Sequence, residues 1–358
     1  MAGDADPTRS DAALTQPVPA LPGLLDPALI DQARQRLTGQ TRRVSVTGDA
    51  LTTPDGATVS FALEFMQHTG TFKARGALNF LGAHIDSGSL PDSGVTIASG
   101  GNAGVACAWA AQRVGARATV FLPETAPAPK VERLRAYGAE VRLQGTEYAD
   151  AAQACAVFAE DSGALMSHAY DHPLIQAGAG TLVEEILEAR PDTTVIAVSV
   201  GGGGLFAGVS AAARRRGLRV VAVEPENCRA LNAALAAGAP VDVTVDSVAA
   251  DSLGARRIAA AALAEAQQPH AVSVLVDDAS IIAARRALWT EHRVVVEHAA
   301  ATALAGIAAG GAGRAAGSAW LTAESTRRAT EVTGTGIGPE DRVCAVLCGA
   351  NTALDSLS

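Results

Sequence analysis

Short apolar runs rich in β-branched residues alternate with alanine-rich stretches along most of this chain. Strands are predicted where the apolar runs fall, at residues 95–98, 119–122, 195–200, 220–223 and 343–347. Helices are expected to follow the first three of these strands, beginning near Ala103, Lys130 and Leu205. This alternation is typical of βα units, in which a parallel sheet is covered by helices on both faces. We therefore predict an α/β fold.

In open α/β sheets the ligand lies outside the carboxyl ends of the strands, where loops lead into helices. Three segments occupy that position in the predicted order of elements: residues 99–104 (SGGNAG), 201–204 (GGGG) and 348–351 (CGAN). The carboxyl ends of parallel strands meet at one edge of a sheet, so we expect these loops to converge at one crevice.

The composition and net charge exclude several classes of protein. The chain has 358 residues, 48% of them hydrophobic and 18% charged, which corresponds to about two domains and argues against dominant disorder. The 28 basic and 37 acidic side chains give a formal net charge of -9, the wrong sign for nucleic acid or an anionic membrane. No run approaches the ~18 to 20 apolar residues of a membrane-spanning helix. We predict a soluble protein with neither kind of partner.

The N-terminus and the cysteines indicate the compartment. Residues 1–24 carry three aspartates and four prolines and no apolar segment after a basic start, so we interpret them as a flexible tail and not a secretory signal. The five cysteines form no C-x-x-C pair, which argues against a disulfide framework or structural zinc. A cytoplasmic location is expected.

Four consecutive glycines, Gly201, Gly202, Gly203 and Gly204, stand between a predicted strand and a predicted helix. Backbone N–H groups of such a loop can wrap a phosphate, and the helix dipole attracts the anion. A flexible turn is the alternative. The run is not G-x-G-x-x-G, and no G-x-x-x-x-G-K-[ST] occurs, so a compact phosphate monoester is favoured over a nucleotide.

Only two of the 28 basic residues are lysines, Lys73 and Lys130. Lys130 stands at the start of an amphipathic helix, where a solvated charge is the ordinary interpretation. Lys73 follows the aromatic residue Phe72 and has no charge partner nearby in the sequence. An amine can form a Schiff base and later act as a base, which a guanidinium cannot. Lys73 is therefore the candidate catalytic residue, with an incidental surface lysine as the alternative.

Residues 67–77, QHTGTFKARGA, resemble the cofactor-lysine motif of fold type II pyridoxal-phosphate enzymes, specifically the serine/threonine dehydratase and serine racemase branch. Four further features resemble that branch in the same order. They are its substrate-carboxylate loop at 99–104, its tetraglycine phosphate loop at 201–204, its active-site glutamate at Glu297 and its pyridine-contacting motif at 348–351. The resemblance implies two open, mainly parallel-sheet domains of the tryptophan synthase β-like architecture.

The resemblance also implies the site residues. Lys73 would hold pyridoxal 5'-phosphate and, once released by the substrate, take its α-proton. Asn102 would hydrogen-bond the ring hydroxyl, and Cys348 would face the pyridine nitrogen. The residues implied in cofactor binding are Phe72, Lys73, Asn102, Gly201, Gly202, Gly203, Gly204, Leu205, Glu297 and Cys348. Those implied in substrate binding are Ser99, Gly100, Gly101, Asn102 and Ala103, with Lys73 and Ser99 as catalytic residues.

Two features depart from the pattern of many relatives. Cys348 stands where many have serine, and either residue gives a neutral contact that leaves the pyridine nitrogen largely unprotonated. The family's cation site resembles residues 224–230, where Glu224 matches the carboxylate ligand and Cys228 offers a backbone carbonyl. Ala230 stands where divalent-binding relatives have an acid, so a monovalent ion such as potassium is favoured.

These features predict an enzyme that dehydrates L-serine or L-threonine to the 2-oxo acid and ammonia, and the resemblance implies a homodimer, because relatives are commonly dimers. We expect a large domain over 25–92 and 172–358, a small domain over 93–171, and no regulatory domain after Asn351. The alternatives are a serine or other amino-acid racemase, a β-replacement enzyme of the same fold, and a non-catalytic cofactor-binding sensor. Retention of Lys73, Ser99 and Glu297 together disfavours the sensor.

Gly100 separates the dehydratase from the racemase. Racemisation needs an acid or base on each face of the substrate, and in the racemases that this chain resembles a serine at the position of Gly100 supplies the second one. Glycine has no side chain to do so. We therefore predict elimination without appreciable racemisation.

Overall fold

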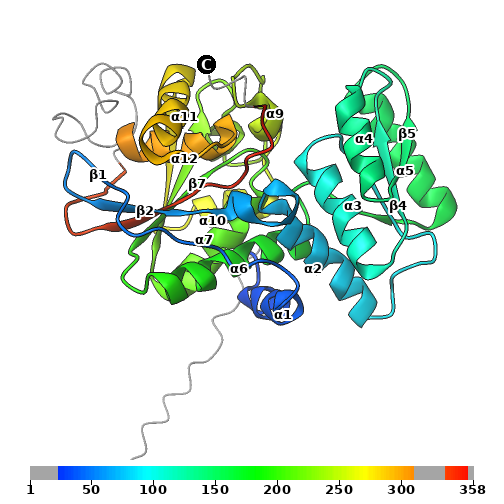
Figure 1. Ribbon diagram of the computed structural model, residues 1–358, viewed down its shortest axis with the longest axis horizontal. Helices are drawn as coiled ribbons and strands as arrows, with labels where there is room; N and C mark the ends of the chain where they lie inside the picture. The colour runs from blue at the N-terminus through cyan, green and yellow to red at the C-terminus, as the bar shows by residue number, and fades with distance from the viewer. Residues whose placement is uncertain (1–22, 310–334, 354–358) are drawn as a thin grey trace, which may run out of the picture.

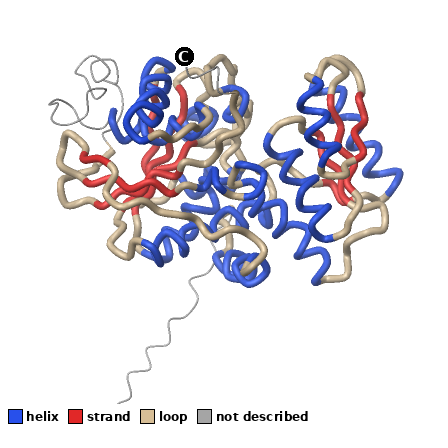
Figure 2. Tube along the Cα trace, in the orientation of Figure 1, coloured by secondary structure: helices blue, strands red, loops and turns tan. Residues whose placement is uncertain are grey.

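The computed structural model describes residues 23–309 and 335–353, so that most of the predicted N-terminal tail lies outside the described residues. The described chain forms two sheets with helices packed around them (Figures 1 and 2). The larger sheet has the order β1-β2-β10-β7-β8-β9 and the smaller β5-β4-β3-β6. Every pairing of these strands is parallel except that of β1 with β2. The predicted α/β fold with two mainly parallel sheets is confirmed.

Five strands occupy the predicted apolar runs to within two residues at each end, and the sequence did not predict the other five, β1, β2, β5, β6 and β9. Those of the larger sheet are β1 (Leu51–Thr52), β2 (Thr58–Ala62), β7 (Val195–Ser199), β8 (Arg219–Pro225), β9 (Ala271–Val276) and β10 (Arg342–Val346). Those of the smaller sheet are β3 (Val95–Ala98), β4 (Ala118–Leu122), β5 (Glu140–Leu143) and β6 (Leu165–Met166). Central strands such as β4 and β7 are buried along their whole length, as expected of strands covered on both faces.

The described residues form helices after β3, β4 and β7, as predicted, and further helices elsewhere. The helices are α1 (Pro27–Leu37), α2 (Lys73–Asp86), α3 (Asn102–Val114), α4 (Ala128–Ala136), α5 (Tyr148–Ser162), α6 (Pro173–Ala189), α7 (Gly204–Arg216), α8 (Ala230–Ala237), α9 (Ala250–Leu253), α10 (Ala260–Ala266), α11 (Asp278–His292) and α12 (His298–Ala309). Two 3-10 turns, η1 (Glu64–Met66) and η2 (His68–Gly70), precede α2. No helix among residues 23–309 and 335–353 has the length and apolar character needed to cross a membrane.

Each sheet has its own cluster of buried apolar side chains. The smaller sheet and α3 to α5 form the lobe on the right of Figure 1, and α2 runs along the boundary between the two lobes. Leu78, Phe80 and Leu81 of α2 belong to the cluster of the smaller sheet, although α2 lies before residue 93. The domain limits drawn from the sequence stay a prediction.

Glycines allow α2, α6 and α7 to touch along their backbones. A Cβ on Gly178 of α6 would lie 2.7 Å from the carbonyl oxygen of Arg75 in α2, and one on Gly180 would lie 2.6 Å from that of Gly208 in α7. No real Cβ contact is that short, so only glycine fits these crossings. The three helices are thereby held at fixed spacings, and two of them begin at predicted site residues.

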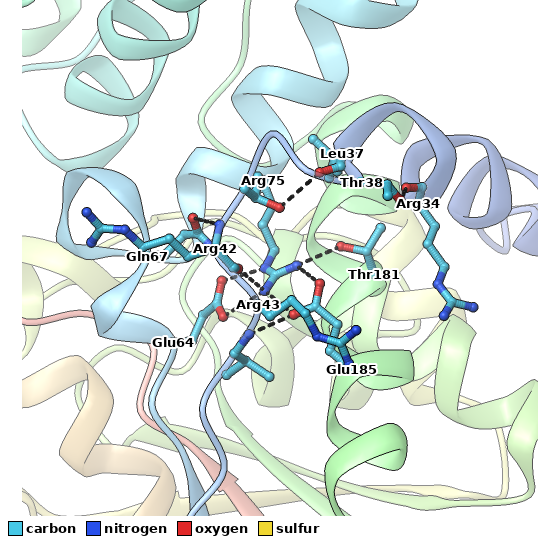
Figure 3. A network of polar contacts seen from close by, with 12 residues as sticks. Arg34, Leu37, Thr38, Arg42, Arg43, Glu64, Gln67, Arg75, Thr181 and Glu185 are labelled. Atoms are coloured by element: carbon cyan, nitrogen blue, oxygen red, sulfur yellow. Dashed lines mark hydrogen bonds and ion pairs between the residues drawn. The ribbon is translucent and has the colours of Figure 1, made fainter.

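Arg75 anchors the start of α2 in a buried polar network (Figure 3). Its fully buried guanidinium donates to Glu64 of η1, with Nε to Oε1 at 2.5 Å, and to both carboxylate oxygens of Glu185 in α6 at 2.8 Å. It also donates to Thr181 Oγ1 at 3.2 Å and to the carbonyl oxygen of Arg42 at 3.3 Å. These bonds tie α2, α6, η1 and the segment after α1 together, two residues beyond Lys73.

Candidate active site

A cavity of about 740 Å³ lies where the loops after β3, β7 and β10 meet. The predicted convergence of these loops is therefore confirmed. Its walls include all of the residues that the sequence implied in cofactor and substrate binding, namely Phe72, Lys73, Ser99, Gly100, Gly101, Asn102, Ala103, Gly201, Gly202, Gly203, Gly204, Leu205, Glu297 and Cys348. Glu224 and Cys228 are not among its lining residues.

Lys73 is the first residue of α2, and the segment before it is fixed by the loop after β10. The Phe72 N–H donates to the Cys348 carbonyl at 3.0 Å, and the Ala350 N–H donates to the Gly70 carbonyl at 3.0 Å. Lys73 Nζ donates to the Ala169 carbonyl at 3.3 Å. Burial lowers the pKa of Lys73, while Cys348 and Glu297 act in the opposite direction. A lowered pKa increases the share of neutral amine, the form that attacks a carbonyl carbon.

The glycine loop presents backbone donors to the cavity. Within the part of the chain that the structure describes, the N–H groups of Gly201, Gly202 and Gly203 donate to no protein acceptor. Gly204 and Leu205 form the first turn of α7, whose N–H groups have no acceptor within the helix. These donors and the positive end of the helix dipole suit a phosphate group.

Glycine is required at Gly203 by both conformation and space. Its φ is +89°, in the left-handed region, and a Cβ there would overlap Ala262 Cβ and lie 2.8 Å from Ile258 Cδ1. A Cβ on Gly202 would overlap the ring of Tyr170. The flexible-turn alternative does not explain this arrangement, because the loop is packed on both sides.

Cys348 presents a buried thiol to the cavity, with its Sγ 3.5 Å from Ser199 Oγ. Burial raises the pKa of Cys348 to about 12, so the thiol is neutral near pH 7. A neutral thiol neither forces a proton onto a pyridine nitrogen nor removes one. The predicted neutral contact at this position is thus chemically available.

Glu297 joins both halves of the cavity wall. Its carboxylate accepts from Asn102 Nδ2 at 3.0 and 3.1 Å, from Ser252 Oγ at 2.9 Å and from the Asn351 N–H at 2.8 Å. Burial raises the pKa of Glu297, and these donors oppose the effect. Asn102, implied as a ring-hydroxyl contact, therefore also holds Glu297. The sequence analysis assigned no role to Ser252 or to Asn351, and Ser252 lies in no recognisable motif.

Glu224 binds the backbone of α8. Its Oε1 accepts from the Leu231 N–H at 2.7 Å and its Oε2 from the Asn232 N–H at 2.9 Å, and burial raises its pKa to about 8. Residues 23–309 and 335–353 contain no group of three or more His, Cys, Asp or Glu side chains placed to hold a metal. Backbone carbonyls such as that of Cys228 are outside that search, so a cation at Glu224 and Cys228 stays a prediction.

Comparison with known proteins decides the family. A family model described as "Pyridoxal-phosphate dependent enzyme" matches residues 39–322. The chain belongs to this family. It is 34% identical to the L-threonine ammonia-lyase of Geobacter sulfurreducens, over 79% of this chain and 71% of that protein. It is 35% identical to the "Serine dehydratase-like" protein of Rattus norvegicus, over 74% and 81%.

Among solved structures, the chain is similar to a pyridoxal 5'-phosphate-dependent aspartate racemase, with a TM-score of 0.78, 27% identity, and coverage of 95% of this chain and 99% of that one. The cavity of this pyridoxal-phosphate enzyme fits the cofactor in three respects. Lys73 offers an amine with a lowered pKa, the glycine loop offers unpaired N–H donors, and Cys348 offers a neutral group.

Replacing Gly203 with valine should weaken cofactor binding by roughly 10- to 100-fold, because a β-branched residue is strained at positive φ and would displace the donors of the loop. Titration of the apoenzyme with pyridoxal phosphate measures this. Gly217→Val is the matched control, because Gly217 has a φ of +67° at the other end of α7 and a Cβ there meets nothing within 4 Å. Equal affinities in the two variants would move the phosphate site elsewhere.

Proposed function

We propose that this enzyme eliminates the hydroxyl group of L-serine or L-threonine and releases the 2-oxo acid and ammonia. The observation that carries the proposal is the absence of a side chain at Gly100, on a cavity wall that otherwise holds every residue implied for the reaction. The similarity to the L-threonine ammonia-lyase and to the serine dehydratase-like protein supports the same reaction.

The N-termini of α3 and α7 both meet this cavity. In the described residues the N–H groups of Gly100 and Gly101, just before α3, donate to no protein acceptor, like those of the glycine loop before α7. Each N-terminus suits one anion. We assign the phosphate to α7 and the α-carboxylate of the amino acid to α3, with Ser99 at the same loop.

The cofactor, when bound, supplies an electron-accepting ring that stabilises negative charge at the substrate Cα. The chain itself has to move the proton. Lys73 Nζ takes the Cα proton from one face, and its lowered pKa keeps the amine available as a base. The buried Cys348 thiol stays neutral beside the ring, and Glu297 holds Asn102 in place through its amide.

The opposite face offers no comparable acid at Gly100. Tyr170 also lines the cavity, but its hydroxyl donates to the Arg257 carbonyl at 3.1 Å, and burial raises the pKa of Tyr170. With no acid at Gly100, a proton removed by Lys73 would return to its original face or stay off while the β-hydroxyl departs. This arrangement favours elimination over racemisation.

We expect pyruvate from L-serine without appreciable D-serine, and chiral chromatography of the reaction decides it. A Cβ on Gly100 would overlap Leu122 Cδ2, so Gly100→Ser should gain racemisation only when Leu122→Ala makes room for the new hydroxyl. Leu122→Ala alone is the control. Substantial D-serine from the unmodified enzyme would contradict the proposal and point to another proton donor, such as Tyr170 or His168.

The resemblance supports three further proposals: a cytoplasmic homodimer, an N-terminal tail up to residue 24 with the domain limits given above, and a potassium ion at Glu224. Gel filtration tests the dimer, and limited proteolysis tests the tail. Ammonia release compared in potassium and in tetramethylammonium chloride tests the ion. A non-catalytic sensor would bind the cofactor and release no ammonia from either amino acid.

A further inference from the structure

Helix α4, beside the smaller sheet, presents two cations to the elements of the larger sheet. Lys130 and Arg133 are three residues apart and so lie on the same side of the helix. Lys130 Nζ donates to Asp251 Oδ1 of α9 at 2.8 Å, and both residues line the cavity. Lys130 keeps a 43% exposed side chain, as the sequence suggested, and its partner Asp251 is 71% exposed.

Arg133 binds two segments that lie far apart in the sequence. Its Nη2 donates to the Thr69 carbonyl at 2.9 Å and to Asn351 Oδ1 at 2.7 Å. Asn351 Nδ2 in turn donates to the same Thr69 carbonyl at 2.9 Å and to Asn102 Oδ1 at 2.7 Å. One guanidinium thereby joins the turn before Lys73 to the loop after β10.

The turn that Arg133 holds is conformationally demanding. Thr69 has a φ of 66°, a region that residues with a side chain rarely adopt, and such a conformation persists only where its surroundings hold it. The next residue, Gly70, packs so closely on Asn351 that a Cβ would lie 2.6 Å from Asn351 Oδ1. The direction in which the chain enters α2, and with it the place of Lys73, depends on these contacts.

We propose that Arg133 is a positioning residue for the reaction at Lys73, an inference that rests on the proposed function. It acts through two neighbours. The Thr69 carbonyl fixes the turn that leads to Lys73, and Asn351 orients Asn102, whose amide holds Glu297. Removal of the guanidinium leaves Asn351 Oδ1 without a donor among the described side chains and loosens both walls of the cavity.

The kinetic test compares Arg133→Met with Arg135→Met in the full-length holoenzyme. Arg135 is an exposed residue of the same helix, and its side chain makes no ion pair or hydrogen bond to another described residue. In Arg133→Met we expect kcat for ammonia release to fall roughly 10- to 100-fold with KM changed less than about threefold, because small misplacements of a reacting group are costly. Arg133→Lys should recover part of kcat, since an ammonium can reach at least one of the two acceptors.

Hydrogen exchange supplies a readout that is independent of turnover. The N–H groups of Phe72 and Ala350 should exchange faster in Arg133→Met than in Arg135→Met, because they close the bonds between the two segments that Arg133 joins. Equal kcat and equal exchange in the two variants would overturn the inference and leave the proposed function intact. A global loss of stability matching the loss of rate would also overturn it, by making Arg133 merely structural. An unmodified enzyme that releases no ammonia would refute the proposed function, while the exchange comparison would still test Arg133.

Discussion

Lys73→Ala should lose covalent attachment of the cofactor and lower turnover by more than about a thousandfold, because it removes both the attachment point and the base. Borohydride reduction followed by peptide mass spectrometry measures the attachment. In the unmodified enzyme we expect the adduct on the peptide that contains Lys73. Ammonia release from L-serine and L-threonine measures the turnover.

The chain provides a matched control for this experiment. Lys130 is the other lysine of the sequence, and it too lines the cavity, where Asp251 holds its amine. In Lys130→Ala the adduct should stay on Lys73. A reducible adduct that survives in Lys73→Ala would contradict the assignment, because only Lys130 and the N-terminus would remain as side-chain or terminal amines.

Arg75→Met should destabilise the protein by about 3–5 kcal/mol, the range found when one partner of a buried ion pair is removed. Arg75 is fully buried, and Glu64 beside it is 1% exposed. Burial raises the pKa of Glu64 and Arg75 opposes it, so without Arg75 the carboxyl must either take up a proton or remain an unpaired buried charge. Urea unfolding monitored by circular dichroism measures the loss.

An exposed ion pair provides the control for the unfolding measurement on Arg75→Met. Arg215 pairs with Asp31 at 2.9 Å, with both side chains more than a third exposed, so Arg215→Met should change stability by no more than about 1 kcal/mol. If Arg75→Met were as mild as Arg215→Met, the network of Figure 3 would not be what anchors the start of α2.

The sequence predicted the walls of the cavity well because each wall is a local motif. A strand, a glycine-rich turn and a helix follow one another within about ten residues, so the loops at 99–104 and 201–204 carry their own signals. The contacts between these walls leave no signal in the local sequence. Arg133 meets Asn351 across 218 residues of sequence, and Asn351 meets Asn102 across 249. No periodicity or spacing relates residues so far apart, which is why Arg133 and Ser252 were missed.

For Lys130 and Glu224, likewise, the sequence did not indicate the partner that each side chain has in the fold. Lys130 has the surroundings of a solvated lysine in sequence, and only the fold brings Asp251 of α9 to its amine. Glu224 lies near the end of β8, and its carboxylate accepts from N–H groups of α8, a contact that the sequence did not indicate. A residue type and its position along a strand indicate what it can bind, but its neighbours in space decide which partner it has.

The glycine crossings of α2, α6 and α7 bear on how far this enzyme can change by mutation. The spacing between the amine of Lys73 and the phosphate loop is transmitted through backbone contacts at Gly178, Gly180 and Gly208, with hardly any side chain in between. Side chains of these helices that lie outside the crossings and outside the Arg75 network can therefore be exchanged with little effect on that spacing. Substitutions at the other residues that line the cavity can therefore change substrate preference. The distance between Lys73 and the phosphate loop, on which cofactor binding depends, would stay the same.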